Sequence, residues 1–135
     1  METVSIVNDE DNVIGETTID EAHDKKLLHR IIHIIIRNSK GDIMIVKRQG
    51  GYCAGLWDIS VGGHVSAGES YEQAAKREIV EEAGVNAPIK FAFKFVNKPR
   101  AHSVSCFTAE CDGPFKFNDE SSEQKFAGKE EIKKM

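Results

Sequence analysis

The stretch GGHVSAGESYEQAAKREIVEEAGV, residues 62–85, constrains the fold more than any other part of the sequence. It combines a glycine-rich loop with a helix that carries both a start signal and a stop signal. Ser70 and Gln73 have the spacing of a capping box, and Gly84 suits the left-handed residue that often ends a helix. We therefore predict a loop followed by a helix from Tyr71 to Ala83.

One face of this predicted helix is apolar at first and acidic in its last two turns. The apolar positions, at the i, i+3, i+4 spacing of a buried helix face, are Tyr71, Ala74, Ala75 and Ile79. The same stripe continues with Glu78 and Glu82, and Glu81 lies at its border. Crowded carboxylates that lose hydration have raised pKa values, and a divalent cation removes this penalty. A site for Mg²⁺ or Mn²⁺, which prefer oxygen ligands, is one interpretation, and a solvated acidic patch is the other.

The rest of the chain predicts a mixed α/β domain that spans residues 1–135 as one unit. Strand patterns occur in VSIV and VIGET, which we expect to form a hairpin, and in LLHRIIHIII, IMIVKR, WDISV, IKFAFKF and SVSCFTAEC. We expect a short helix over residues 19–26, a loop in GGHVSAGE, and a charged tail with helical turns near residues 129–134. Phe91, Phe93 and Phe95 alternate, which predicts that they line the buried face of a strand.

Charge and cysteine content argue against several classes of function. A net charge of −4 gives no broad attraction to nucleic acid or to an anionic membrane. The first residues lack the basic start and apolar run of a signal peptide, and the cysteines Cys53, Cys106 and Cys111 lack metal-type spacing. We expect free thiols in a reducing, cytoplasmic compartment. Cys53 lies in a glycine-rich loop, and no base in the pattern predicts that it is a nucleophile.

The loop–helix segment resembles a complete Nudix box. The matching residues are Gly63, Glu69 and the run REIVEEAGV from Arg77 to Val85. The resemblance implies a Nudix fold, which is an α/β/α sandwich around a mixed β-sheet with the loop–helix motif at its centre. It also implies hydrolysis of a nucleoside diphosphate linked to another group. The expected partner is a small diphosphate-containing molecule, with no nucleic-acid polymer and no membrane, and homodimers are common among such relatives.

The resemblance also implies a metal-dependent pyrophosphohydrolase with defined ligands. By analogy, Glu78, Glu81 and Glu82 would bind Mg²⁺ or Mn²⁺ and would be the catalytic carboxylates. A carbonyl group of Gly62 or Gly63 would complete the ligand shell. The ion would then explain why glutamates lie on the inward face of the helix.

Further residues are expected around this centre. Glu69 would pair with Arg77 and hold the loop against the helix. One carboxylate must orient or deprotonate the attacking water, and its candidates are Glu78, Glu82 and, in the tail, Glu120 and Glu123. The residues expected near the substrate are Lys47, Arg48, His64, Glu120 and Glu123. Lys47 and Arg48 end a strand where a cation could grip a phosphate, and an exposed strand end without a ligand is the alternative.

A second resemblance extends to the flanks of the box. NDEDNVIGETTIDEAHDKKLLHR and GLWDISVGGHVSAGES resemble type I isopentenyl-diphosphate isomerases, in which histidines at about His23, His29 and His64 help to bind a metal. Those isomerases use a cysteine for proton chemistry where this chain has Gly62, so a hydrolase is favoured. An isomerase and a nucleotide-binding module without turnover remain the alternatives. Each histidine has a structural or exposed role as its alternative, and His102 has no expected role.

Overall fold

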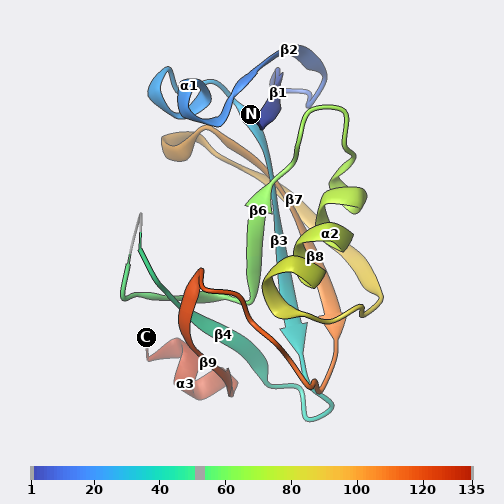
Figure 1. The fold of residues 1–135 in the computed structure, drawn as a ribbon, viewed down its shortest axis with the longest axis vertical. Coiled ribbons are helices and arrows are strands. Elements are labelled where there is room, and N and C mark those ends of the chain that lie inside the picture. Colours follow the sequence, from blue (N-terminus) through green and yellow to red (C-terminus); the bar gives the residue numbers. More distant parts are fainter. Residues whose placement is uncertain (1, 51–53, 135) are drawn as a thin grey trace.

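The computed structural model describes residues 2–50 and 54–134, so Cys53 lies outside the described residues. The described chain forms nine strands, three α-helices and one 3₁₀ helix (Figure 1). In chain order these are β1 (Thr3–Val7), β2 (Val13–Thr18), α1 (Ile19–Asp24), β3 (His29–Arg37), β4 (Ile43–Arg48), β5 (Trp57–Ile59), β6 (Val61–His64), α2 (Tyr71–Ala83), β7 (Ile89–Asn97), η1 (Lys98–Arg100), β8 (His102–Glu110), β9 (Ser121–Ala127) and α3 (Lys129–Lys133). The predicted mixed α/β class is confirmed.

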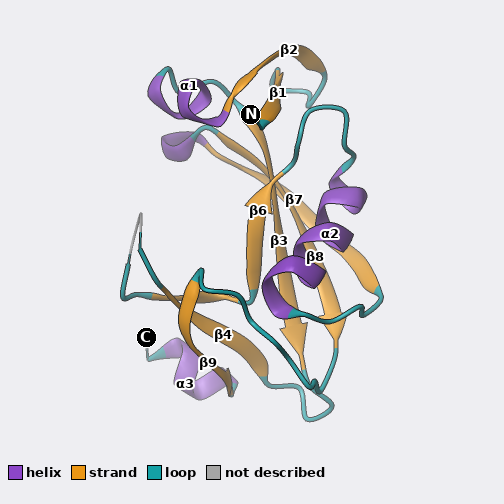
Figure 2. Ribbon diagram, in the orientation of Figure 1, coloured by secondary structure: helices purple, strands orange, loops and turns teal. Residues whose placement is uncertain are grey.

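Strand β3 is the centre of the sheet (Figure 2). It pairs in parallel with β8 along its whole length and antiparallel with β6 on its other side. Strand β7 extends the sheet beyond β8. At its two ends β3 meets the β1–β2 hairpin and strand β4, and β4 pairs in turn with β5 and β9. Chain segments that are far apart in the sequence are therefore brought together around β3.

The two faces of β3 have different neighbours. The residues that face α2, all buried, are Ile32, Ile34 and Ile36, and they pack with the apolar face of the helix. Because side chains alternate along a strand, Ile31 and His33 are directed to the opposite face. There Ile31 packs against Val104 and Cys106 of β8. Helix α2 thus covers one face of the central strands, as Figure 1 shows.

Helix α2 begins and ends where the sequence predicts. The Ser70 hydroxyl accepts the N–H of Gln73 at 3.1 Å, and the Gln73 side chain accepts the N–H of Ser70 at 2.9 Å. Gly84 has a φ of 67° and donates its N–H to the carbonyl of Val80. None of the described helices has both the length and the apolar character needed to cross a membrane.

Two segments form strands where the sequence predicts a loop and a charged tail. Gly62, Gly63 and His64 belong to β6, because they pair with β3 although two of them lack side chains. Residues 121–127, SSEQKFA, form β9 and pair with β4. Apolar and polar residues do not alternate in this segment. It is a strand because it pairs with β4, and its own sequence does not indicate one.

The prediction that the β7 phenylalanines are buried is wrong. Phe91, Phe93 and Phe95 are 52%, 50% and 40% exposed. In the described part of the chain β7 pairs only with β8, so it is an edge strand with little to cover it. A bulge between Phe91 and Phe93 also divides them, because Phe91 lies opposite Phe107 whereas Phe93 lies opposite Cys106 on the other face.

Gly84→Ala should destabilise the protein more than Gly41→Ala. Both glycines have left-handed φ angles, 67° and 85°, which cost a residue with a side chain about 1 kcal/mol. A Cβ at Gly84 would also lie 2.7 Å from the carbonyl oxygen of Lys116, whereas a Cβ at Gly41 meets open space. Urea denaturation should show that the free energy of unfolding falls by about 2–4 kcal/mol in Gly84→Ala and by about 1 kcal/mol in Gly41→Ala. Equal losses of unfolding free energy in the two variants would show that the close contact with Lys116 does not destabilise Gly84→Ala.

Candidate active site

A cavity of about 700 Å³ lies beside strand β6 and the carboxyl half of α2. Its charged and titratable lining residues include Glu78, Glu81, Glu82 and Glu120, the basic residues Arg48, Arg77 and Arg100, and the histidines His23, His33, His64 and His102. The described residues pair β6 with β3 only, so the other edge of β6 is open to the cavity. A side chain at position 63 would point to α2, whereas one at position 62 would lie against the His33 ring on the opposite face. The cavity therefore reaches both faces of the sheet.

Glycines in β6 allow the helix carboxylates to lie against the strand. A Cβ at Gly63 would lie 2.5 Å from Cδ of Glu78, so a larger residue has no room there. The N–H of Gly62 donates to Oε2 of Glu82 at 3.1 Å. The backbone that was expected to supply a metal ligand therefore contacts both carboxylates.

Burial controls the protonation of these two carboxylates. It raises the pKa of Glu78 to about 7, against the opposing effect of Arg77. Burial also raises the pKa of Glu82 well above its usual range, and a hydrogen bond with Glu120 and the charge of Glu120 add to this effect. Two neighbouring carboxyl groups thus resist ionisation, which is the condition that a bound cation relieves.

Of the two tail glutamates, Glu120 reaches the buried carboxylates. Its side chain hydrogen-bonds that of Glu82, and its charge also acts on Glu78. Glu123 lies 3.2 Å from Nζ of Lys47 in a salt bridge, and neither residue of this pair lines the cavity. The structure therefore places Glu120 at the cavity and Glu123 and Lys47 outside it, a distinction that the sequence does not provide.

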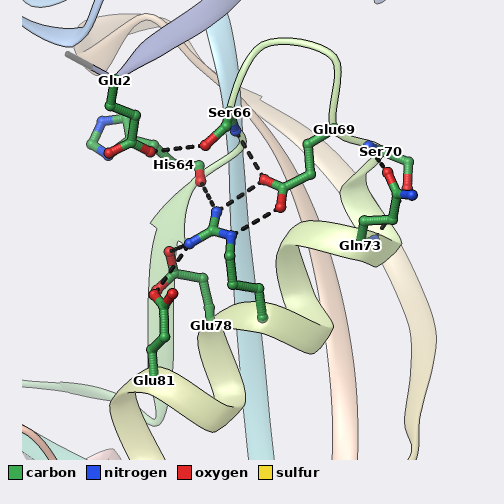
Figure 3. Close-up of polar contacts among 9 residues, drawn as sticks. Glu2, His64, Ser66, Glu69, Ser70, Gln73, Glu78 and Glu81 are labelled. Carbon is green, nitrogen blue, oxygen red and sulfur yellow. Dashed lines mark hydrogen bonds and ion pairs between the residues drawn. The ribbon is translucent and has the colours of Figure 1, made fainter.

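Arg77 connects the loop, strand β6 and the helix. Figure 3 shows its partners Glu69, His64 and Glu78 converging on one place. Its Nε and Nη2 atoms each lie 2.9 Å from one carboxylate oxygen of Glu69, which also accepts the N–H of Ser66 at 3.0 Å. Arg77 further donates to the His64 carbonyl at 3.2 Å and to Oε1 of Glu78 at 2.7 Å. The bonds to Glu69 and Glu78 raise the pKa of Arg77, and Arg77 lowers the pKa of Glu69. A permanently charged guanidinium therefore fixes Glu78 beside the loop.

Glu81 and Arg48 lie at the rim of this arrangement. The Glu81 side chain is 55% exposed and accepts a hydrogen bond from Nη1 of Arg77 at 3.2 Å. Arg48 lines the cavity, and its Nη1 atom lies 3.1 Å from Oδ2 of Asp58. Glu81 is thus placed next to the buried pair but is much more solvated than Glu78, whose side chain is 13% exposed.

Four histidines lie together at another part of the cavity. The ligand nitrogens of His23, His29, His64 and His102 all lie within 4.8 Å of one another. Burial lowers the pKa of His64 to about 4 and that of His102 to about 3, so both are neutral at neutral pH. Sequence reasoning missed His102, because only the parallel register of β3 and β8 brings it beside His29.

The sequence model of the family described as NUDIX domain matches residues 27–133. The chain belongs to the Nudix family. It is 33% identical over 138 residues to the uncharacterized Nudix hydrolase YfcD of Escherichia coli (strain K12), covering 97% of this chain and 76% of that protein. The prediction of a Nudix hydrolase, an enzyme class that acts on phosphoric anhydride bonds, is therefore confirmed.

Two further similarities support this assignment and the second resemblance. The chain is 36% identical over 97 residues to isopentenyl-diphosphate Delta-isomerase 2 of Photorhabdus laumondii, covering 70% of this chain but only 55% of that protein. The crystal structure of DR0079 from Deinococcus radiodurans superposes with a TM-score of 0.85 at 27% identity, over 97% of this chain and 86% of that one. The Nudix fold predicted from the sequence is confirmed.

Glu82→Gln should stabilise the metal-free protein at high pH. A carboxyl whose pKa is raised on folding makes the native state bind more protons than the unfolded chain, so stability falls as pH rises from the ordinary value of 4.5 through the raised value. With chelator at about pH 8, unfolding of Glu82→Gln should require at least about 1.4 kcal/mol more than that of the wild type, and this gain should shrink towards about pH 4.5. Glu72→Gln, at an exposed position of the same helix, serves as the matched control. A gain that does not depend on pH would contradict burial as its cause.

Proposed function

We propose that this Nudix enzyme is a metal-dependent pyrophosphohydrolase that cleaves a diphosphate linkage in a small molecule of the nucleoside-diphosphate type. The observation that carries the proposal is the meeting of Glu78, Glu82 and Glu120 in one cavity. Glu78 and Glu82 are partly buried, and the charge of the more exposed Glu120 acts on both. Carboxyl groups gathered in this way repel one another, and a hard divalent cation offsets the repulsion through oxygen ligands. A chain that needed only a stable core would place apolar side chains at the two partly buried helix positions, 78 and 82.

The proposed ligands are the carboxylates of Glu78 and Glu82, with Glu81 at the rim and a carbonyl of the Gly62–Gly63 segment. When bound, Mg²⁺ or Mn²⁺ supplies positive charge that offsets the diphosphate oxygens and acidifies water. Arg77 holds Glu78 in place through its own bonds to the loop. The chain thus contributes a preformed set of oxygen atoms whose orientation does not depend on the substrate.

Glu120 is the proposed base for the attacking water. It approaches Glu82 from the segment that precedes β9, whose backbone hydrogen-bonds the carboxyl end of α2 through Asn118, and it lines the cavity. In the reaction the water oxygen attacks phosphorus, the bridging P–O bond breaks, and the water proton passes to the Glu120 carboxylate. Arg48 and Arg100 line the same cavity and are the proposed phosphate-binding cations.

An isomerase of allylic diphosphates is the second candidate function. The 36% identity to an isopentenyl-diphosphate isomerase favours it, although this chain spans about half the length of that relative. Gly62 opposes it, because the position at which those isomerases carry the reacting cysteine has no side chain here. A homodimer and a cytoplasmic location stay predictions from the sequence.

A substrate panel tests the proposed function. Nucleoside diphosphate derivatives and isoprenoid diphosphates would be incubated with the full chain and Mg²⁺ or Mn²⁺, and with chelator as the control. We expect cleavage of a phosphoric anhydride bond in at least one nucleoside compound, abolished by chelator. Conversion of isopentenyl diphosphate to dimethylallyl diphosphate without hydrolysis would support the isomerase instead. Binding without any turnover would support a non-catalytic nucleotide-binding module.

Glu120→Gln and Glu123→Gln form a matched pair within one segment. Loss of a positioned base lowers turnover by about a hundredfold, so we expect this loss in kcat for Glu120→Gln. Glu123 pairs with Lys47 outside the cavity, so Glu123→Gln should stay within about twofold of the wild type. Steady-state kinetics on the substrate found in the panel would measure both. Equal effects of the two substitutions would remove Glu120 from the role of base.

A further inference from the structure

Gly62 lies between the carboxylates and the sheet face opposite α2. Its N–H donates to Oε2 of Glu82 at 3.1 Å, so its backbone borders the acidic part of the cavity. A side chain here would lie against the ring of His33 on the opposite face, with its Cβ 3.4 Å from Cδ2 of that ring. Because Gly62 is exposed and has no side chain, the space beside this ring is open to the cavity.

The imidazole of His33 is held by packing and not by hydrogen bonds. Its ring centroid lies 6.3 Å from that of Phe95, and the two rings meet edge to face at 63°. Neither ring nitrogen of His33 has a hydrogen-bond partner among the described residues. Burial lowers the pKa of His33, so the ring is neutral at neutral pH. His33 therefore presents a flat, uncharged aromatic surface to the cavity that it lines.

Phe95 lies on the side of His33 away from Gly62. Strands β6 and β8 flank β3 on opposite sides, and β7 lies beyond β8 (Figure 2). Register places Phe93 in the same row of the sheet as His33, and Phe95 in the next row. The ring centroids of Phe93 and Phe95 are 6.1 Å apart, and the two side chains are 50% and 40% exposed. This face of the sheet is therefore aromatic from the cavity outwards, and the contact with Phe95 leaves the side of the imidazole towards Gly62 facing the cavity.

A fixed carboxylate lies at the rim of the space beside His33. Asp58 lines the cavity, and its charge acts on the His33 ring. Oδ1 of Asp58 accepts the N–H of Ile59 at 2.8 Å, and Oδ2 lies 3.1 Å from Nη1 of Arg48. A hydrocarbon chain bound here would remove water from both charged groups, which costs free energy. A ring with polar atoms at its edge can instead stack on His33 and hydrogen-bond these groups.

We propose that the space between Gly62 and His33 is a subsite for the nucleobase of the substrate, which stacks on the His33 imidazole. Stacking of a base on an aromatic side chain strengthens binding by about 5- to 100-fold. Because Gly62 borders both this space and Glu82, one nucleotide can place its base beside His33 and its diphosphate at the carboxylates. The proposal rests on the proposed function for the position of the diphosphate, whereas the aromatic surface does not depend on it.

Binding of nucleotides and of the same phosphate without a base tests the subsite. The full chain with Mg²⁺ at about pH 7.5 would be titrated calorimetrically with AMP, CMP, GMP and UMP, with ribose 5-phosphate, which lacks the base, and with isopentenyl phosphate. We expect at least one nucleotide to bind about tenfold or more tightly than ribose 5-phosphate. The ratio of these two dissociation constants measures the contribution of the base. Because the measurement requires no turnover, absence of hydrolysis in the substrate panel would contradict the proposed function and not the subsite.

Variants of His33 test whether its ring causes the preference for a base. His33→Leu removes the aromatic ring, so the ratio should fall at least about fivefold while the affinity for ribose 5-phosphate stays unchanged. His33→Phe keeps an aromatic ring and should retain the ratio within about twofold. Phe91→Ala is the matched control, because Phe91 lies on the edge strand β7 but packs against Phe107 on the side of α2. Circular dichroism would verify the fold of each variant, and His33→Gln replaces His33→Leu if the latter fails to fold.

Four outcomes would overturn the proposal. The first is a wild-type protein that binds none of the four nucleotides more tightly than ribose 5-phosphate. The second is an unchanged ratio in a folded His33→Leu or His33→Gln variant, which would leave His33 a structural role alone. The third is an equally large loss in Phe91→Ala or His33→Phe, which would show that the aromatic ring at position 33 is not the cause. The fourth is isopentenyl phosphate that binds as tightly as the nucleotides and loses affinity in His33→Leu, which would assign the space to a hydrocarbon chain.

Discussion

The packing of two helix carboxylates against the glycines of strand β6 determines how α2 sits on the sheet. Glu78 and Glu82 continue the apolar face of α2, so they cannot leave the sheet without unpacking Ile79 from the core. Gly63 leaves room for Glu78, and the backbone of Gly62 contacts Glu82. The same packing that stabilises the helix therefore holds two carboxyl groups where they ionise poorly. An ion bound there would add its binding free energy to the stability of the fold.

Strand β6 gives this small domain two chemically different surfaces. On the side of α2 it meets carboxylates, and on the opposite side His64 joins three other histidines at the end of β3. Arg77 links the two sides, because one guanidinium contacts the His64 carbonyl and the Glu78 carboxylate. Movement of this strand would thus affect both groups of side chains. The cavity that runs past β6 makes both available to one bound molecule.

The sequence predicts the parts of the site that lie within one continuous segment. The limits of α2 and its inward glutamates follow from Ser70, Gly84 and the helical period, all of which act over a few residues. Strand β9 and the place of Glu120 depend on pairing with β4, which the charged tail does not indicate. His102 joins the cluster only through the parallel register of β3 and β8, across 73 residues. The exposed phenylalanines depend on which strand forms the sheet edge, and alternation alone cannot tell an edge strand from a covered one.

Binding of Mn²⁺ to the protein shows directly whether Glu78 and Glu82 form a metal centre. Electron paramagnetic resonance reports free Mn²⁺, so a titration at about pH 7.5 measures the ion bound by the protein. We expect saturable loss of the free-ion signal with wild-type protein, loss of this binding in a Glu78→Gln, Glu82→Gln double variant, and unchanged binding in His102→Ala. Equal binding by the double variant, or no binding by a folded wild-type protein, would contradict a metal centre at the acidic face of α2.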